Sequence, residues 1–170
     1  MARTDLIILV LIAPENTPVF KNIRLRALQD SPTAFSSTYA EESKLTDADW
    51  LKRTSQWSGL NSVTYLAMDA GIAVGIAAGV RDRIDPQRAD LMSMWVAPAH
   101  RRLGIGRMLV DAVAAWARAQ DMLYLCLMVT SNNDHALRFY QSLGFALTGR
   151  NEPYRNDQAL LNFEMHRLLS

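Results

Sequence analysis

The chain has 170 residues, a length that suits one domain with a sizeable hydrophobic core. Apolar residues make up 49% of it and charged residues 21%, which is ordinary for a globular protein. The formal net charge of +1 provides no general attraction to nucleic acid or to an anionic membrane, so we expect neither as a partner. The single cysteine, Cys126, excludes an internal disulfide. Its apolar neighbours predict core packing, and its lack of a partner favours a reducing, cytoplasmic location.

The apolar run from Leu6 to Ala13 is either a secretory signal or a buried strand. Asp5 interrupts the basic flank before it, and no clean small-residue cleavage pattern follows. The run is also far shorter than the roughly 20 residues that cross a bilayer. We therefore interpret it as the first strand, which Pro14 and Pro18 close.

Apolar spacing and turn residues divide the rest of the chain into strands and helices. The clearest helical pattern runs from Ile105 to Trp116, with apolar residues every three or four positions. Asp69-Ala70-Gly71 marks a hairpin turn, and Leu123–Thr130 is apolar almost throughout, as in a strand covered on both faces. The predicted strands cover residues 5–13, 61–68, 71–80, 90–96, 123–130, 145–150 and 158–167, and the predicted helical segments cover residues 19–30, 33–43, 46–59, 104–120 and 133–143.

The predicted order of elements is β-α-α-β-β-β-α-β-α-β-β, which describes an α/β fold with a mixed sheet. The central β-α-β segment implies two parallel strands joined by a right-handed crossover helix. The other connections imply antiparallel pairing. No composition shift indicates a linker, so we expect a single domain over residues 1–170.

The most informative stretch runs from Val96 to Gly106 and reads Val-Ala-Pro-Ala-His-Arg-Arg-Leu-Gly-Ile-Gly. Glycine lets a backbone approach a ligand, and the free N–H groups and dipole of a helix N-terminus attract phosphate. A tight turn for packing explains the glycines equally well. The spacing fits neither a Walker A loop nor a dinucleotide fingerprint, whose third glycine would fall at Leu109. If a pyrophosphate binds here, we expect free backbone amides and mobile arginine side chains to hold it. The predicted phosphate-binding residues are Arg101, Arg102, Leu103, Gly104, Ile105, Gly106 and Arg107.

These residues resemble a signature of the GNAT N-acetyltransferase superfamily, Arg101-x-x-Gly104-x-Gly106 preceded by Val96-x-Pro98. After the next predicted strand, Asn133-x-x-Ala136-x-x-Phe139-Tyr140-x-x-x-Gly144-Phe145 looks like the family's second signature. The resemblance covers about residues 89–146. It implies a GNAT-like sheet in one N-acetyltransferase domain that uses acetyl-CoA as co-substrate. It also implies transfer of the acetyl group to a primary amine by direct attack in a ternary complex, and it suggests a homodimer.

The resemblance also assigns roles to residues on the strands. Acetyl-CoA would lie where the predicted strands 90–96 and 123–130 separate. The Met94 amide would face the thioester carbonyl, where a donor stabilises the developing oxyanion. Backbone groups of the first strand and the asparagine at the next helix would bind the pantetheine arm. The cofactor-binding residues outside the loop are then Met94, Trp95, Val96, Asn133 and Tyr140.

Acetyl transfer requires a neutral amine and a proton for the departing thiolate. Tyr140 matches the tyrosine that supplies this proton in similar enzymes, and a core tyrosine is the alternative. Asp90 stands where histone-type members carry their base glutamate. Its shorter side chain would need a bridging water, and a solvated strand-entry charge is the alternative. Met128 stands where ribosomal-protein acetylating members carry their glutamate, so that solution is absent.

The acceptor leaves little trace in the sequence. Glu41 and Glu42 lie in the helical region that usually walls the acceptor pocket in this family, although an exposed helix face explains both equally well. With Phe35 they are the predicted substrate-binding residues. We favour a small-molecule amine over a peptide or protein, because no docking extension is evident, and a non-catalytic acyl-CoA sensor is the other alternative. His135 reads as a solvated first-turn residue, and the scattered histidines predict no metal site.

Overall fold

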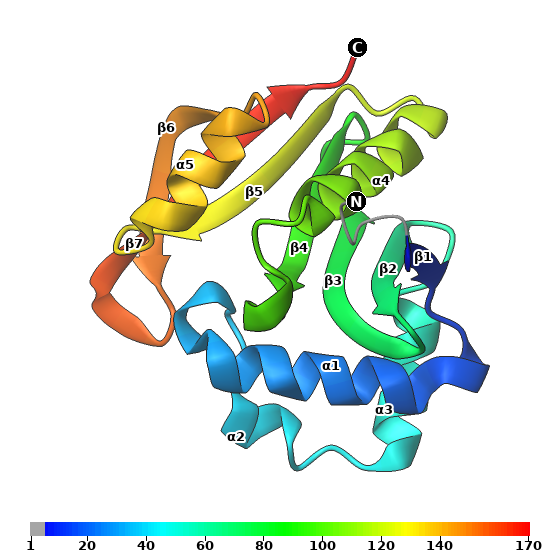
Figure 1. Ribbon diagram of the computed structural model, residues 1–170. Coiled ribbons are helices and arrows are strands. Elements are labelled where there is room, and N and C mark those ends of the chain that lie inside the picture. Colours follow the sequence, from blue (N-terminus) through cyan, green and yellow to red (C-terminus); the bar gives the residue numbers. More distant parts are fainter. Residues whose placement is uncertain (1–5) are drawn as a thin grey trace.

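A seven-stranded mixed sheet organises the computed structural model, which describes residues 6–170 (Figure 1). The strands follow the order β1-β2-β3-β4-β5-β7-β6, in which β4 and β5 are parallel and the other neighbours are antiparallel. The strands are β1 (Ile7–Leu11), β2 (Ser62–Asp69), β3 (Ile72–Arg81), β4 (Arg88–Val96), β5 (Tyr124–Thr130), β6 (Ala146–Tyr154) and β7 (Asp157–Leu168). The α-helices are α1 (Thr17–Asp30), α2 (Tyr39–Glu42), α3 (Asp47–Gln56), α4 (Ile105–Ala119) and α5 (Asp134–Ser142).

The α/β class and the mixed sheet are confirmed, and the N-terminal region differs in detail. It holds three α-helices, as many as the three predicted helical segments, although the predicted order of elements counted only two. The predicted segment 33–43 is interrupted because the Thr38 side chain accepts a hydrogen bond from the Glu41 amide and starts α2 as a new N-cap. The predicted strand 5–13 is observed as β1, and its residue 5 lies outside the described residues.

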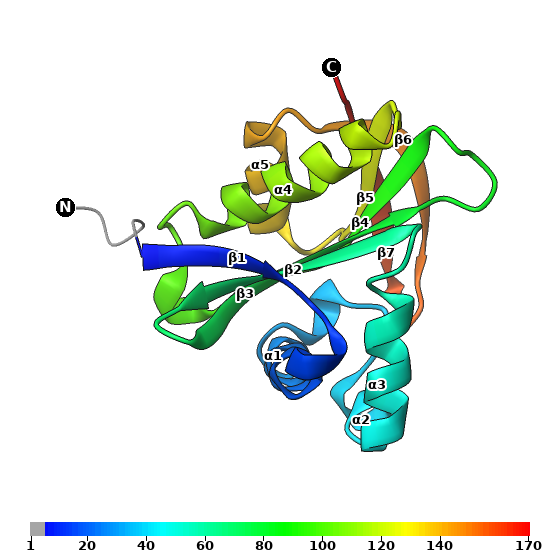
Figure 2. The same cartoon turned by 90° about the vertical axis from the view of Figure 1, so that its right-hand side faces the viewer.

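Helices cover both faces of the sheet. The helices α1, α2 and α3 lie against one face, and α4 and α5 lie against the other (Figure 2). Phe20 and Trp50 are fully buried under the first face, and their rings meet edge to face with centroids 5.7 Å apart. Leu109 and Val113 are fully buried under the second face. Within residues 6–170, no helix has the length and apolar character needed to cross a bilayer.

Small residues on β3 allow α4 to pack very close to the sheet. A Cβ atom added at Gly79 would lie 2.7 Å from Val113 Cγ1 and 3.0 Å from the Trp116 ring. A Cβ atom added at Gly75 would lie 2.9 Å from Leu109 Cδ1. Interiors have few voids, so these contacts fix the height and direction of α4 over the sheet. They thereby fix where the loop before α4 meets β4.

β4 and β5 pair only over their first residues and then diverge. The parallel register ends at the pair Asp90↔Cys126. Just beyond this pair, the register of β4 against β3 shifts, and Ser93 has a left-handed φ of +57°. A bulge of this kind bends a strand and increases its local twist. The two strands therefore separate toward their C-terminal ends, as Figure 1 shows.

Substitution of Gly79 tests the close packing of α4. Gly79→Ala should lower the free energy of unfolding by about 1–3 kcal/mol, because a methyl group must displace Val113 and Trp116. Urea unfolding followed by circular dichroism measures this loss. Gly59→Ala is the matched control, because its nearest neighbour would lie 3.7 Å away. Equal unfolding midpoints for the two variants would contradict the packing described.

Candidate active site

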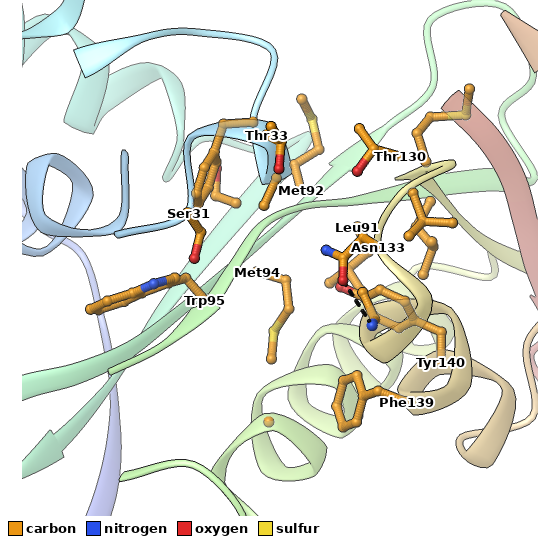
Figure 3. A pocket seen from close by; sticks show the side chains of 18 of the residues that line it. Ser31, Thr33, Leu91, Met92, Met94, Trp95, Thr130, Asn133, Phe139 and Tyr140 are labelled. Atoms are coloured by element: carbon orange, nitrogen blue, oxygen red, sulfur yellow. Dashed lines mark hydrogen bonds between the residues drawn. The ribbon is translucent and has the colours of Figure 1, made fainter. Parts of the chain in front are cut away.

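A cavity of about 1590 Å³ occupies the space between the diverging strands. Its walls come from α1 and the segment after it, from β4 and the loop before α4, from β5 and α5, and from β6 and β7. Figure 3 shows Met94 between Trp95 on one side and Phe139 and Tyr140 on the other. Most predicted site residues line this cavity, namely Phe35, Glu42, Asp90, Met94, Trp95, Val96, Arg101, Arg102, Gly104, Gly106, Arg107, Asn133 and Tyr140. Glu41, Leu103 and Ile105 are not among its lining residues.

The loop before α4 has unpaired backbone amides where it borders this cavity. Gly104 is the N-cap and has a left-handed φ of +83°, which glycine adopts without strain. Within residues 6–170, the amides from Gly104 to Arg107 have no hydrogen-bond acceptor. A helix leaves such donors unsatisfied at its start, and together with the helix dipole they suit a phosphate group. Arg102 and Arg107 are exposed beside them.

Glycine is required at the two positions of this loop, Gly104 and Gly106, for different structural reasons. A Cβ atom at Gly106 would lie 2.9 Å from Phe139 Cζ on α5 and 3.2 Å from Met94 Cε on β4. At Gly104 a Cβ atom would meet open space, so the backbone conformation is what requires glycine there. Close packing, the alternative suggested by the sequence, therefore explains the glycine at position 106. The left-handed turn explains the glycine at position 104.

Arg101 is held in place, in contrast to the mobile charge expected for it. Its guanidinium donates to the Val96 carbonyl at 2.9 Å and pairs with Asp30 at 2.6 Å. Trp95 donates its indole N–H to the same carboxylate at 2.9 Å. Burial disfavours the ionised carboxylate, but hydrogen bonds from Trp95 and Arg101 bring the pKa of Asp30 below its ordinary value. Arg101 therefore ties the loop to the end of α1 and to β4.

Tyr140 and Asn133 lie together on the wall made by α5 and the end of β5 (Figure 3). Asn133 accepts a hydrogen bond from the Ala136 amide at 3.1 Å, which caps α5 and leaves the side-chain NH₂ group for a ligand. The Tyr140 ring packs between Phe139 and Phe145, with centroids 5.2 and 5.7 Å away. Burial raises the pKa of Tyr140, so the phenol keeps its proton at neutral pH.

Glu42 belongs to a buried ion-pair network that sequence reasoning missed. Its carboxylate accepts hydrogen bonds from Arg24 Nε at 3.0 Å and from Arg24 Nη2 at 2.8 Å. It also forms an ion pair with Arg53, whose Nη1 atom lies 2.9 Å away. Arg24 Nη1 also donates to Ser93 Oγ on the β4 bulge at 2.8 Å. Burial disfavours the charge, but the hydrogen bonds and charge of Arg24 and the charge of Arg53 hold the pKa of Glu42 below its ordinary value. With both oxygens engaged, Glu42 anchors the bulge and has no free oxygen for an amine.

The other two predicted acceptor residues have different positions. Phe35 is 5% exposed and lines the cavity, with the Arg24 guanidinium 4.8 Å from its ring centroid. Glu41 faces solvent. Its carboxylate accepts a hydrogen bond from the Thr38 amide at 3.0 Å and forms an ion pair with Arg155 at 3.2 Å. Glu41 therefore stabilises the start of α2 on an exposed helix face, which was the alternative to its predicted role at the acceptor.

Asp90 is paired in the structure, in contrast to the solvated charge that was its alternative interpretation. Arg88 donates Nε to Asp90 Oδ1 at 2.9 Å, and Arg88 Nη1 donates to Glu164 Oε2 at 2.9 Å. Glu164 lines the same cavity from β7 and is 7% exposed. Sequence reasoning did not find Glu164, because its position depends on how β7 pairs with β5.

The comparisons with known proteins agree with this geometry. A model of the Acetyltransferase (GNAT) family matches residues 25–145, well over half of the chain. A streptothricin acetyltransferase of Streptomyces lavendulae is 39% identical over 90 residues, which cover 52% of this chain and 47% of that protein. The catalytic subunit naa20 of the N-terminal acetyltransferase B complex of Schizosaccharomyces pombe is 30% identical, over 71% of this chain and 69% of that protein.

Solved structures show the same fold. A GNAT-family acetyltransferase from Streptococcus pneumoniae has a TM-score of 0.80 at 20% identity, with 96% of this chain and 99% of that chain covered. The structure of yncA from Salmonella typhimurium with its cofactor acetyl-CoA has a TM-score of 0.78 at 19% identity, with 96% and 94% covered. The chain spans about half the length of the streptothricin acetyltransferase. From the family match over most of its length, we conclude that the chain belongs to the GNAT acetyltransferase family.

Proposed function

We propose that the protein is an acetyl-CoA-dependent N-acetyltransferase that acetylates a primary amine of a small molecule. The observation that carries this proposal is the set of unpaired amides of Gly104, Gly106 and Arg107, which border a cavity between two diverging strands. Membership of the GNAT acetyltransferase family supports it. Acetyl-CoA supplies the acetyl group as an activated thioester. The cavity extends from the loop into the space between α1–α3 and β7, so both reactants can share it.

The residues present fit this co-substrate along the length of the cavity. The loop amides and the exposed guanidinium groups of Arg102 and Arg107 would hold the diphosphate. The backbone of β4 from Met94 to Val96 would bind the pantetheine arm, with the NH₂ group of Asn133 opposite. The Met94 amide would donate to the thioester carbonyl as negative charge develops on its oxygen.

Two side chains would handle the protons during transfer. An alkyl amine is mostly protonated at neutral pH, because its pKa lies near 10.4. Asp90 would remove the proton through its Oδ2 atom, directly or through one water, since Oδ1 is occupied by Arg88. The amine then forms its bond to the acetyl carbon as the carbon–sulfur bond breaks. Tyr140 would give its proton to the departing thiolate, and the second proton that the nitrogen loses on becoming an amide would pass through solvent and restore the Tyr140 hydroxyl.

The end of the cavity at the β6–β7 hairpin favours a small acceptor over a long peptide. Tyr154 donates its hydroxyl to the Phe35 carbonyl at 2.6 Å, and Asn156 donates to the Ser36 carbonyl at 3.1 Å. These bonds join the hairpin to the segment after α1, which lie beside each other in Figure 1. These contacts restrict the space for an acceptor at this end of the cavity. One relative is named a streptothricin acetyltransferase, and another is named the catalytic subunit of an N-terminal acetyltransferase complex. The class of acceptor is therefore part of this proposal.

Two further expectations stay predictions. The cytoplasmic location rests on the single thiol Cys126, which is buried and unpaired within the described residues. The homodimer rests on the family resemblance alone. A non-catalytic acyl-CoA sensor is the competing function, and it predicts binding of acetyl-CoA without release of free thiol in the presence of amines.

The role of the loop amides can be isolated at Arg107. Arg107→Pro removes both the guanidinium and one amide at the third position of α4, whose N–H has no intrahelical acceptor, whereas Arg107→Ala removes only the guanidinium. A hydrogen bond to a charged group contributes about 1.5–3 kcal/mol, so the Kd for CoA should be about 10- to 100-fold higher in the proline variant than in the alanine variant. Isothermal titration calorimetry measures both constants. Equal constants, or no heat with the unmodified protein, would contradict the proposed grip on the diphosphate.

Tyr140→Phe tests the proton donor. Loss of the hydroxyl should lower kcat by about 100-fold, within the usual range for a general acid, and leave the Kd for acetyl-CoA within a factor of two. Thiol release across a panel of primary amines measures kcat. Tyr124→Phe is the matched control, because it removes the hydroxyl of a tyrosine that does not line the cavity. Unchanged turnover in a folded Tyr140→Phe protein would remove Tyr140 from the mechanism.

A further inference from the structure

Arg88 lies between two carboxylates on the acceptor side of the cavity. Its Nε and Nη2 atoms lie 2.9 and 2.8 Å from Asp90 Oδ1, and its Nη1 atom lies 2.9 Å from Glu164 Oε2. All three side chains are largely buried and line the cavity. The guanidinium therefore uses one oxygen from each carboxylate. Within residues 6–170, Asp90 Oδ2 has no hydrogen-bond partner.

Glu164 reaches this place from a strand far along the sequence. The antiparallel register pairs Glu164 with Met128, and the parallel register pairs Asp90 with Cys126. Residues two apart on a strand share a face, so Asp90, Met128 and Glu164 lie on the same face of the sheet. Sequence reasoning had noted that Met128 stands where some members carry a glutamate. The structure puts a carboxylate directly across from that position, on the adjacent strand.

Two further contacts hold Glu164 in this position. Thr148 donates its hydroxyl to Oε1 at 2.9 Å, and Arg150 lies 3.6 Å from Oε2. Burial disfavours the charge, but hydrogen bonds from Arg88 and Thr148 lower the pKa of Glu164. Glu164 therefore stays ionised at neutral pH and keeps its hold on Arg88.

The surroundings of Asp90 act in the opposite direction. Burial raises the pKa of Asp90, and the charges of Asp82 and Glu164 add to this, against the hydrogen bond and charge of Arg88. The neighbouring thiol of Cys126 is neutral, because burial raises its pKa to about 11. Glu164 is thus an anion at neutral pH, and Asp90 is the better proton acceptor of the two.

We infer that Glu164 is a positioning residue of the acceptor site, which anchors Arg88 so that Asp90 keeps its Oδ2 atom for the acceptor amine. This inference rests on the proposed N-acetyltransferase function. A guanidinium freed from Glu164 can turn and take both oxygens of Asp90, since its fork matches a single carboxylate. No oxygen of Asp90 would then be free to take the proton of the amine. The loss of the Glu164 charge would also leave Asp90 a weaker base.

The experiment compares Glu164→Gln with Glu164→Asp and with Glu15→Gln, an exposed residue that does not line the cavity. Carboxyl ¹³C NMR of the protein without ligands measures the pKa of Asp90, assigned through Asp90→Asn. Glu164→Gln should lower this pKa by about one unit, as expected for loss of one charge at close range. Glu164→Asp should return it toward the original value, and Glu15→Gln should leave it unchanged. Arg88→Gln should raise it, because the cation is lost, and an unchanged pKa in this variant would overturn the inference even if Glu164→Gln does not fold.

Activity provides the second measurement. Glu164→Gln should lower kcat about tenfold, leave the KM for acetyl-CoA within twofold and move the acidic limb of the kcat profile to lower pH, while Glu164→Asp recovers part of the rate. An unchanged pKa of Asp90 would overturn the inference, even if kcat fell, because Glu164 would then be merely structural. If the unmodified protein acetylates no amine, the proposed function fails, whereas the NMR result still decides whether Glu164 acts on Asp90.

Discussion

The divergence of β4 from β5 is the constraint on which the rest of the site depends. Parallel pairing stops at Asp90↔Cys126, and the bulge at Ser93 then bends β4 away. A left-handed φ is unfavourable for serine, so something must hold it. Arg24 does so through its 2.8 Å hydrogen bond to Ser93 Oγ. Without this divergence, paired backbone would fill the space that forms the cavity.

Ion pairs in this protein place side chains more than they stabilise the fold. Burying charges costs desolvation energy that the pairing only partly returns. The Arg24–Glu42–Arg53 network joins α1, α2 and α3 to the β4 bulge, and the Asp90–Arg88–Glu164 network joins β4 to β7. Each network lies along a wall of the same cavity. They set the positions of the bulge and of the Asp90 and Glu164 carboxylates relative to the loop before α4.

The loop before α4 shows how one short segment meets several demands. Gly104 provides the left-handed turn, Gly106 allows α4, α5 and β4 to approach, and Arg101 is fixed by Asp30 and Val96. With these restraints in place, the amides need not be ordered when a ligand arrives. A preorganised anion site avoids that entropic cost.

The sequence by itself determined the fold class, nearly all of the strands and helices, the loop before α4 and the positions of Tyr140 and Asn133. These features depend on local periodicity, on turn residues and on two signatures whose members lie close together in the chain. Only the tertiary structure decided the roles of the acidic residues. Glu41 and Glu42 are neighbours in sequence, yet one faces solvent and the other is 2% exposed between two arginines. Glu164 and Arg88 meet because β4 and β7 flank β5, a pairing of distant strands that no local pattern encodes.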